Sequence, residues 1–454
     1  MEAIGSGYDL RVEVSYKQIL QIALPITLAI LVPQVNFVVN TIFLGHLNEE
    51  SLGNAGITGV YYLIFALAAN GLNSAMQTVF SRFAGSGDIG MFRYSIAQGI
   101  RLSLIFSAIC VLFTWLVAPY ILSVVADKKA FPVEMGFLRI RIWGIFFLFI
   151  FQICNAFLVA SLNSRLLITA FIVETVLNII LDYGLIFGKL GMPKLGFNGA
   201  AYASVIAEFS GMITVIAVIH KTGLQKKYQL FSNFKYHRNL SREIVRVALP
   251  LVSQFMISAT TWLAFFLLIE PRGEQAKAIS NVMRIVYGIT GIFIWALSGT
   301  TNVMVSNLMG QHRQQDIFPL LKKIVILSVT CCLFICLLIN FFPTQFFNLF
   351  GQDESFVEAG IPVIRVVSLG ILLLGIANPF LNAVTGTGKT KVNLGIEIIA
   401  IAIYMVYTWY FMVIDYQSLA MGWTNEFVYW TTIFLFSFFY MRSGKWKTSK
   451  IYGE

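Results

Sequence analysis

Charged side chains are scarce in this sequence. Asp, Glu, Lys and Arg together make up 12% of the 454 residues, whereas hydrophobic residues make up 57% and Phe alone occurs 40 times. No ordinary soluble domain has this composition. We therefore expect most of the chain to lie in an apolar environment.

Cysteine and histidine are also few, with five and four residues. The cysteines fall inside apolar stretches without CxxC spacing, so we expect small hydrophobic side chains and not disulfides or metal ligands. The histidines lie at the ends of those stretches or in loops, without a second ligand nearby. No nucleophile and base stand together, and no paired acids favour a membrane-embedded enzyme or scaffold. We expect no enzyme, no cofactor, and no bound metal other than Na⁺.

Long apolar stretches dominate what is present. Each is long enough to cross a hydrocarbon core of about 30 Å as a helix. The sequence therefore predicts an all-α integral membrane protein with twelve transmembrane helices. They are expected near residues 17–44, 53–80, 94–120, 135–160, 166–188, 198–220, 243–269, 279–308, 321–346, 357–384, 392–414 and 419–441.

The net charge of +10 reflects basic residues that sort by loop. Lys and Arg concentrate at the termini and in the loops after even-numbered spans, most densely around 220–246, and are not interleaved with aromatics as a nucleic-acid surface would require. By the positive-inside rule both termini are cytoplasmic. The first span is too long for a signal peptide and lacks its cleavage pattern, so it is expected to remain as an anchor.

An internal repeat divides the chain. QIALP (21–25) recurs as RVALP (246–250), and SRFAG (81–85) recurs as SNLMG (306–310). Six spans per half give both halves the same orientation, related by a pseudo-two-fold axis along the membrane normal, as in alternating-access transporters. The expected parts are an N-terminal six-helix lobe (1–220), a basic cytoplasmic linker (221–242), a C-terminal six-helix lobe (243–441) and a cytoplasmic tail (442–454).

Polar residues at membrane depth are the candidate functional residues, because they are costly there and usually face the protein interior or a wet cavity. Glu174, Asn178 and Asp182 recur at intervals of four and would form one stripe on a helix. On the first span Asn36 and Asn40 are also four apart and follow Pro33, which should loosen or kink that helix.

Ser204 and Glu208 repeat the four-residue interval on the sixth span. Together with the stripe on the fifth span, such groups could supply oxygen ligands to a small hard cation or hold a buried carboxylate that takes up a proton. The alternative is hydrogen bonding between helices, for which Asn and Ser are common.

Specific motifs give the chain a resemblance to a known family. The two ALP motifs, NTIFLGHLNEESLGNAGI (40–57) and NIILDYGLIFGKLGMPKLGFNGAAYASVIAE (178–208) resemble the multidrug and toxic compound extrusion (MATE) family over essentially the whole chain. The resemblance is closer to its DinF type than to its NorM type. It implies export of organic, amphipathic or cationic compounds by a monomer in the bacterial inner membrane, in exchange for inward H⁺ or Na⁺.

The resemblance also implies a cation site in the N-terminal lobe. The matching residues are Asn178 and Asp182 on the fifth helix and Ser204 on the sixth, while Asn40 stands where the family has Asp on the first helix. An amide offers an oxygen but cannot titrate, so the site has lost one negative charge. A second family site on the seventh helix has Ser258 in place of Glu, so we expect coupling to rest on the N-terminal lobe.

We expect Asp182 to bind the coupling ion, with Asn178, Asn40 and Ser204 as oxygen donors. Glu174, Asn36 and Glu208 would be polar neighbours, and the sequence assigns no role to Glu174 or Glu397. The first helix would bend at prolines when the site fills, and aromatics suited to organic cations would line the substrate cavity. These are Pro25 and Pro33 for bending and Phe37, Tyr61, Tyr62, Trp262 and Trp295 for the cavity.

A flippase for lipid-linked saccharides or other lipid precursors, from the same superfamily, is the alternative. Pyrophosphate recognition favours Arg and Lys. Arg101, Arg284 and Arg365 lie within predicted spans, and their convergence on a central cavity would support this function.

Overall fold

The computed structural model describes residues 10–47, 49–125, 129–230, 235–348, 350 and 354–449. The side chains of residues 32–38, 41, 49, 50, 52, 124 and 125 are outside this description. Three residues predicted to matter, Pro33, Asn36 and Phe37, are among them, so the predictions on those side chains lie outside the described part.

Helices account for the secondary structure of the described residues, which contain no strand. In the first half they are α1 (Tyr16–Leu47), α2 (Glu49–Ser86), α3 (Ile89–Leu116), α4 (Ala118–Val125), α5 (Phe131–Arg141), α6 (Gly144–Ala160), η1 (Ser164–Leu166), α7 (Leu167–Phe187), α8 (Phe197–Lys221) and α9 (Leu224–Lys227). In the second half they are α10 (Arg238–Ile269), η2 (Glu270–Arg272), α11 (Glu274–Gly310), η3 (Gln314–Asp316), α12 (Ile317–Phe341), α13 (Pro343–Asn348), α14 (Glu354–Gly386), α15 (Thr390–Trp409), η4 (Tyr410–Ile414), α16 (Leu419–Trp423) and α17 (Asn425–Ser443).

The predicted membrane-spanning architecture is confirmed. Ten helical segments within the described residues are long and apolar enough to cross a membrane, and they correspond to all the predicted spans except the first and the last. The first falls on α1, where Tyr16–Leu31 is apolar up to the residues whose side chains are not described, and the last falls on α16 and α17. The chain is therefore a multi-pass membrane protein.

The fourth predicted span corresponds to one apolar segment, Phe131–Ala160, but a two-residue turn interrupts its helix. The sequence predicts one helix over 135–160, whereas α5 ends at Arg141 and α6 begins at Gly144. Ile142 and Trp143 keep helical backbone angles, and their N–H groups donate to the carbonyls of Leu138 and Ile140. The break places the Arg141 side chain at the end of a helix inside the span.

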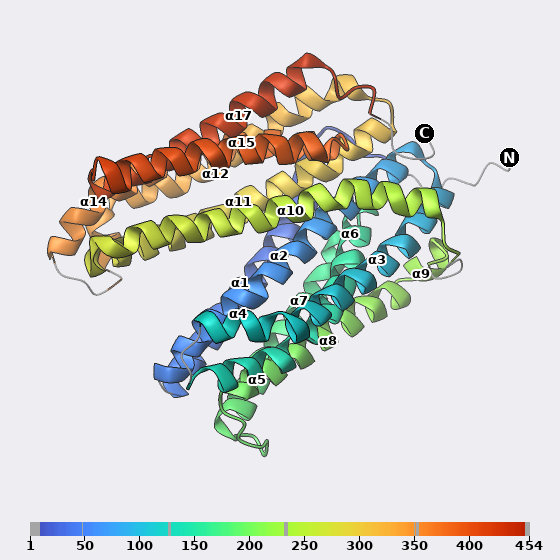
Figure 1. Cartoon of the computed structure of the whole chain (residues 1–454). Coiled ribbons are helices and arrows are strands. Elements are labelled where there is room, and N and C mark those ends of the chain that lie inside the picture. The colour runs from blue at the N-terminus through green and yellow to red at the C-terminus, as the bar shows by residue number, and fades with distance from the viewer. Residues whose placement is uncertain are drawn as a thin grey trace. The chain divides into compact units, whose positions relative to one another are not determined.

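The described residues cluster into two compact units. Among the described residues, one contains Leu10 and residues from 28 to 252, and the other contains residues 11–27 and from 253 to 449. Within the second unit α14 packs along α11, α12 and α17, and α15 packs on α17, as Figure 1 shows. The lobe boundaries near 220 and 242 stay a prediction.

Two helices pass from one unit to the other. Helix α1 changes unit between Thr27 and Leu28, and α10 changes unit between Val252 and Ser253. The two crossing points are 225 residues apart (253 − 28), which is the offset of the repeated ALP motifs, and each follows its motif by two residues. α1 is continuous through positions 25 and 33, so neither proline ends the helix; bending at these prolines stays a prediction.

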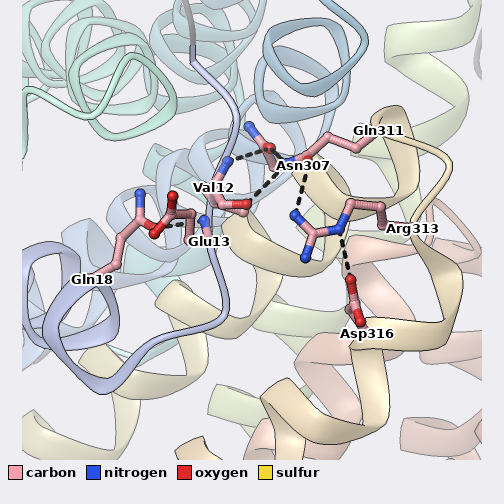
Figure 2. Close-up of polar contacts among 7 residues, drawn as sticks. All are labelled: Val12, Glu13, Gln18, Asn307, Gln311, Arg313 and Asp316. Carbon is pink, nitrogen blue, oxygen red and sulfur yellow. Dashed lines mark hydrogen bonds and ion pairs between the residues drawn. The ribbon is translucent and has the colours of Figure 1, made fainter.

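An extended segment before α1 is attached to the second unit (Figure 2). The backbone N–H of Val12 donates to Asn307 Oδ1 at 3.1 Å, and Gln311 Nε2 donates to the Val12 carbonyl at 3.1 Å. Lys323 Nζ donates to the Val14 carbonyl at 2.7 Å. Val12 is fully buried, so the segment is a packed part of the second unit.

Close packing of α7 and α8 positions the candidate site. The apolar run of α7 ends where Gly188 adopts a left-handed conformation with φ 70°, which glycine accepts without steric cost. On α8, Gly199 lies against the backbone of Leu185, where a Cβ would be 2.7 Å from the carbonyl carbon. The missing side chain lets the two helix backbones approach each other.

Candidate cation-coupling site

Asp182 lies at the centre of the candidate site and is fully buried on α7. With the Asn40 amide nitrogen turned toward it, Nδ2 donates to Asp182 Oδ2 at 2.7 Å and to Oδ1 at 3.0 Å. In this orientation the amide oxygen, Oδ1, lies 3.5 Å from Ser204 Oγ on α8. Three of the four residues predicted for the cation site are therefore in direct contact, from three different helices.

Asn178 lies one turn before Asp182 on the same helix and is 3% exposed. Its Nδ2 has no hydrogen-bond partner in the described part of the chain. A buried polar group without a partner costs about 1–3 kcal/mol, so such groups in native proteins usually serve a ligand, a water or a second state. No group of three or more His, Cys, Asp or Glu side chains suited to a metal ion occurs among the described residues.

Glu174, the first residue of the stripe, lies against α8 at Gly211. A Cβ at Gly211 would be 2.6 Å from Glu174 Oε2. In the part of the chain that the structure describes, Glu174 makes no hydrogen bond or ion pair. Glu174 is thus a half-buried carboxylate within a span. Its side chain fits against α8 because residue 211 is a glycine.

A buried ion pair next to this stripe was not predicted from the sequence. Arg141 donates from Nη1 to Glu208 Oε2 at 2.7 Å and from Nη2 to Oε1 at 2.6 Å. The two side chains are only 13% and 10% exposed. Tyr62 donates its hydroxyl to Glu208 Oε1 at 2.9 Å, and its ring centroid lies 3.6 Å from the Arg141 guanidinium carbon. Bidentate geometry and stacking on an aromatic ring are both contacts that favour Arg over Lys.

The turn between α5 and α6 lies next to this ion pair. Gly144, the first residue of α6, faces the pair, and a Cβ there would overlap Glu208 Oε2 and crowd Arg141 Nη1. Glu208 was predicted only as a polar neighbour of the cation site, and the structure shows that Arg141 neutralises it. The signal in the sequence was a second arginine in FLRIRIWG (137–144), inside an apolar stretch.

The second unit holds its own buried carboxylate at Glu397, which is 2% exposed. Ser258 and Tyr429 each donate a hydroxyl to Glu397 Oε1 at 2.5 Å, and Gln254 Nε2 donates to Oε2 at 3.3 Å. Ser258, which was considered only as a replacement for a family Glu, thus serves as a donor to an acid on α15.

Glu426 is a further buried carboxylate that the sequence did not single out. It lies at the start of α17 and is 2% exposed. Trp430 Nε1 donates to Oε2 at 3.0 Å and the Tyr287 hydroxyl donates to the same atom at 3.1 Å. Glu426 accepts hydrogen bonds from neutral donors, whereas Glu208 forms an ion pair with Arg141.

The aromatic residues predicted for the substrate cavity have different surroundings. Tyr62 belongs to the ion pair, and Tyr61 donates its hydroxyl at 2.9 Å to a threonine on α3. The Trp262 ring packs on a neighbouring phenylalanine with centroids 5.2 Å apart, and Trp295 is 42% exposed. Their role in binding substrate stays a prediction.

The three arginines considered for a flippase each have their own neighbour. Arg101 lies over the ring of Tyr236 at 5.8 Å, and Arg284 lies over Phe266 at 5.7 Å. Arg365 is exposed. Among the described residues, no hydrogen bond or ion pair joins any of the three to another.

The sequence model of the MatE family matches residues 25–184 and, a second time, residues 250–410. The two matches begin at Pro25 and Pro250, the last residues of the repeated ALP motifs. The chain belongs to the MatE family. It is therefore a membrane transporter and not an enzyme, and the internal repeat found in the sequence is the repeat of this family.

Curated relatives in this family are similar over most of their length. A probable multidrug resistance protein NorM of Thermotoga maritima is 22% identical over 439 residues, which cover 95% of this chain and 93% of the relative. A protein of the same name from Synechocystis is 21% identical over 395 residues, 85% of each chain. These relatives carry the NorM name, and the predicted closer likeness to the DinF type finds no support in them.

Solved structures share the fold. A multidrug resistance MATE family transporter of the MOP superfamily in an outward-facing conformation has a TM-score of 0.85 at 18% identity, covering 98% of this chain and 100% of that one. A MOP superfamily transporter from Pyrococcus furiosus, described as having a binding pocket of reverse polarity, has a TM-score of 0.85 at 19% identity, covering 97% and 98%. At this identity the likeness concerns the fold.

Proposed function

We propose that this transporter exports small organic compounds, amphipathic or cationic, in exchange for an inward flux of H⁺ or Na⁺. The observation that carries the proposal is Asp182, which is fully buried within a span and faces an uncharged amide. No described Lys, Arg or His side chain forms an ion pair with it. A carboxylate in this setting gains from binding a cation or a proton, because an unpaired charge at membrane depth is costly.

The amide of Asn40 gives the site two states. With its nitrogen toward Asp182, the amide donates hydrogen bonds that stabilise the charged carboxylate. Rotation of the amide would present its oxygen instead, together with Ser204 Oγ and Asp182, as ligands for Na⁺. Ion binding and hydrogen bonding by Asn40 would thus be alternatives.

Coupling requires that ion and substrate favour different conformations, since a ligand with equal affinity for both states shifts nothing. Asn40 lies on α1, which belongs to both compact units along its length. A change at Asn40 therefore acts on a helix shared by the two units. This supports α1 as the element that responds to the ion.

The class of substrate is inferred from relatives named multidrug resistance proteins. We place the protein in a bacterial inner membrane as a monomer with both termini cytoplasmic, as the distribution of Lys and Arg predicts. The flippase alternative stays a prediction. It would be supported by convergence of Arg101, Arg284 and Arg365 on a central cavity, and Arg101 and Arg284 contact different aromatic rings.

Efflux of ethidium from proteoliposomes, with proton and sodium gradients imposed separately, tests the proposal. One or both gradients should drive export by the wild-type protein, and Asp182→Asn should abolish the response. Glu358→Gln is the matched control, because this acid is exposed near the start of α14. Efflux by Asp182→Asn at the wild-type rate, or export driven by neither gradient, would overturn the proposal.

A further inference from the structure

An arginine-lined hollow lies where the start of α10 meets α3, within the first unit. Its volume is ≈ 780 Å³. Arg101 on α3 and Arg238 and Arg242 on α10 contribute its three cationic side chains. The remaining lining is mostly apolar, with two hydroxyl-bearing side chains, and comprises Leu102, Leu104, Ile105, Tyr236, Ser241 and Val245.

Hydrogen bonds through Gln98 hold the two walls of this hollow together. Gln98 Nε2 donates to the backbone carbonyl of Lys235 at 3.0 Å, and Ser241 Oγ donates to Gln98 Oε1 at 2.9 Å. Gln98 and Ser241 are buried. Arg101 lies one turn beyond Gln98 on α3, so these bonds fix its distance from the start of α10.

The three arginines carry no acidic partner in the part of the chain that is described. Glu243, the one acid in the sequence from 235 to 246, pairs with Arg246 at 3.6 Å instead. Arg101 contacts the ring of Tyr236, which leaves its guanidinium donors for another acceptor. Three cationic groups without internal compensation favour an anion as ligand.

The location favours a lipid over a soluble anion. Leu104 and Ile105, next to Arg101, are 42% and 55% exposed, and Ile109 and Leu112 continue that apolar surface along α3 with exposures of 56% and 58%. Arg238 and Arg242 are in the first two turns of α10, at the end of the basic linker. Cationic groups at one end of a continuous apolar helix face suit a molecule with a phosphate and acyl chains.

We propose that this hollow binds the phosphate of an anionic phospholipid headgroup, with the acyl chains along the exposed face of α3. The three arginines contact the phosphate oxygens, and Tyr236 orients Arg101 through its ring. A headgroup without a compensating amine, such as phosphatidylglycerol, matches the charge of the site. The proposal is independent of the transported substrate and of the coupling ion.

Titration of a fluorescent phosphatidylglycerol into the purified full-length protein in neutral detergent tests this site. We expect saturable binding, a much weaker response to the same fluorophore on phosphatidylcholine, and little competition by inorganic phosphate. Each of Arg101→Gln, Arg238→Gln and Arg242→Gln should weaken binding about fivefold, and the triple variant about a hundredfold.

A control triple variant removes the same charge elsewhere. Arg442→Gln, Lys445→Gln and Lys447→Gln change exposed basic residues near the end of α17, and binding should stay within about twofold of wild type if the hollow is the site. An equal loss of lipid binding in both triple variants would show that general surface charge, and not the hollow, attracts the lipid. Displacement of the bound lipid by inorganic phosphate would show that the hollow binds soluble anions. Equal binding of phosphatidylglycerol and phosphatidylcholine would rule out the proposed headgroup site. Unfolding midpoints without lipid establish that each variant is folded.

Discussion

Arg141 and Glu208 form a bidentate ion pair inside the membrane-spanning part of the first unit, with N···O distances of 2.6 and 2.7 Å. Removing one member of a buried pair leaves an uncompensated charge, which typically costs about 3–5 kcal/mol. Arg141→Met should therefore lower the thermal unfolding midpoint of the detergent-purified protein strongly. The double variant Arg141→Met, Glu208→Met should recover much of the loss, and a double variant as unstable as the single one would contradict this reasoning.

Substitution of Gly144 is expected to destabilise the protein for a steric reason. In Gly144→Ala the new methyl group would overlap Glu208 Oε2, and overpacking of this kind costs about 1–3 kcal/mol. Gly136→Ala on α5 is the matched control, since a Cβ there has no atom within 4 Å. The comparison is made on unfolding midpoints and ethidium efflux, and equal behaviour of the two variants would show that the ion pair tolerates displacement.

Asn40→Asp should strengthen sodium binding, because it adds a negative charge directly beside Asp182. The expected result is that Na⁺ raises the unfolding midpoint at a concentration about tenfold lower than for wild type, roughly 1.4 kcal/mol of added binding free energy. Choline chloride at the same ionic strength controls for screening. A variant with unchanged sodium dependence would separate Asn40 from the ion site.

Asn307→Leu should release the segment before α1. Val12 would lose an acceptor for its backbone N–H, and a buried unsatisfied donor costs about 1–3 kcal/mol. We expect trypsin to cleave after Arg11 about tenfold faster, as followed by mass spectrometry of the shortened chain. Gln275→Leu is the control on the same helix, because Gln275 Nε2 makes only an exposed 3.5 Å hydrogen bond to Ser355 Oγ among the contacts described. Equal cleavage rates in the two variants would argue that Asn307 does not hold the segment.

Sequence patterns predicted the features that depend on one helix at a time. The apolar runs located the spans, and the interval of four between Asn178 and Asp182 placed both side chains on one face. Contact between Asn40, Asp182 and Ser204 needed the family pattern as well, because spacing within a helix says nothing about which neighbouring helix supplies the partner.

Features that depend on pairing between helices were missed for the same reason. Arg141 lies inside the predicted span 135–160 and was not singled out, because its role follows from the missing side chain of Gly144 and an acid 67 positions later. Glu426 was overlooked because it lies next to a turn in the sequence, whereas the packed helices around it exclude water.

The passage of α1 from one unit to the other has a consequence for biosynthesis. Residues 11–27 are synthesised early, yet the unit into which they pack consists otherwise of residues 253–449 among those described. Domains made during translation generally fold from the N-terminus onward, and this segment cannot follow that order. Residues 11–27 therefore cannot complete their packing until more than half of the 454 residues have been synthesised.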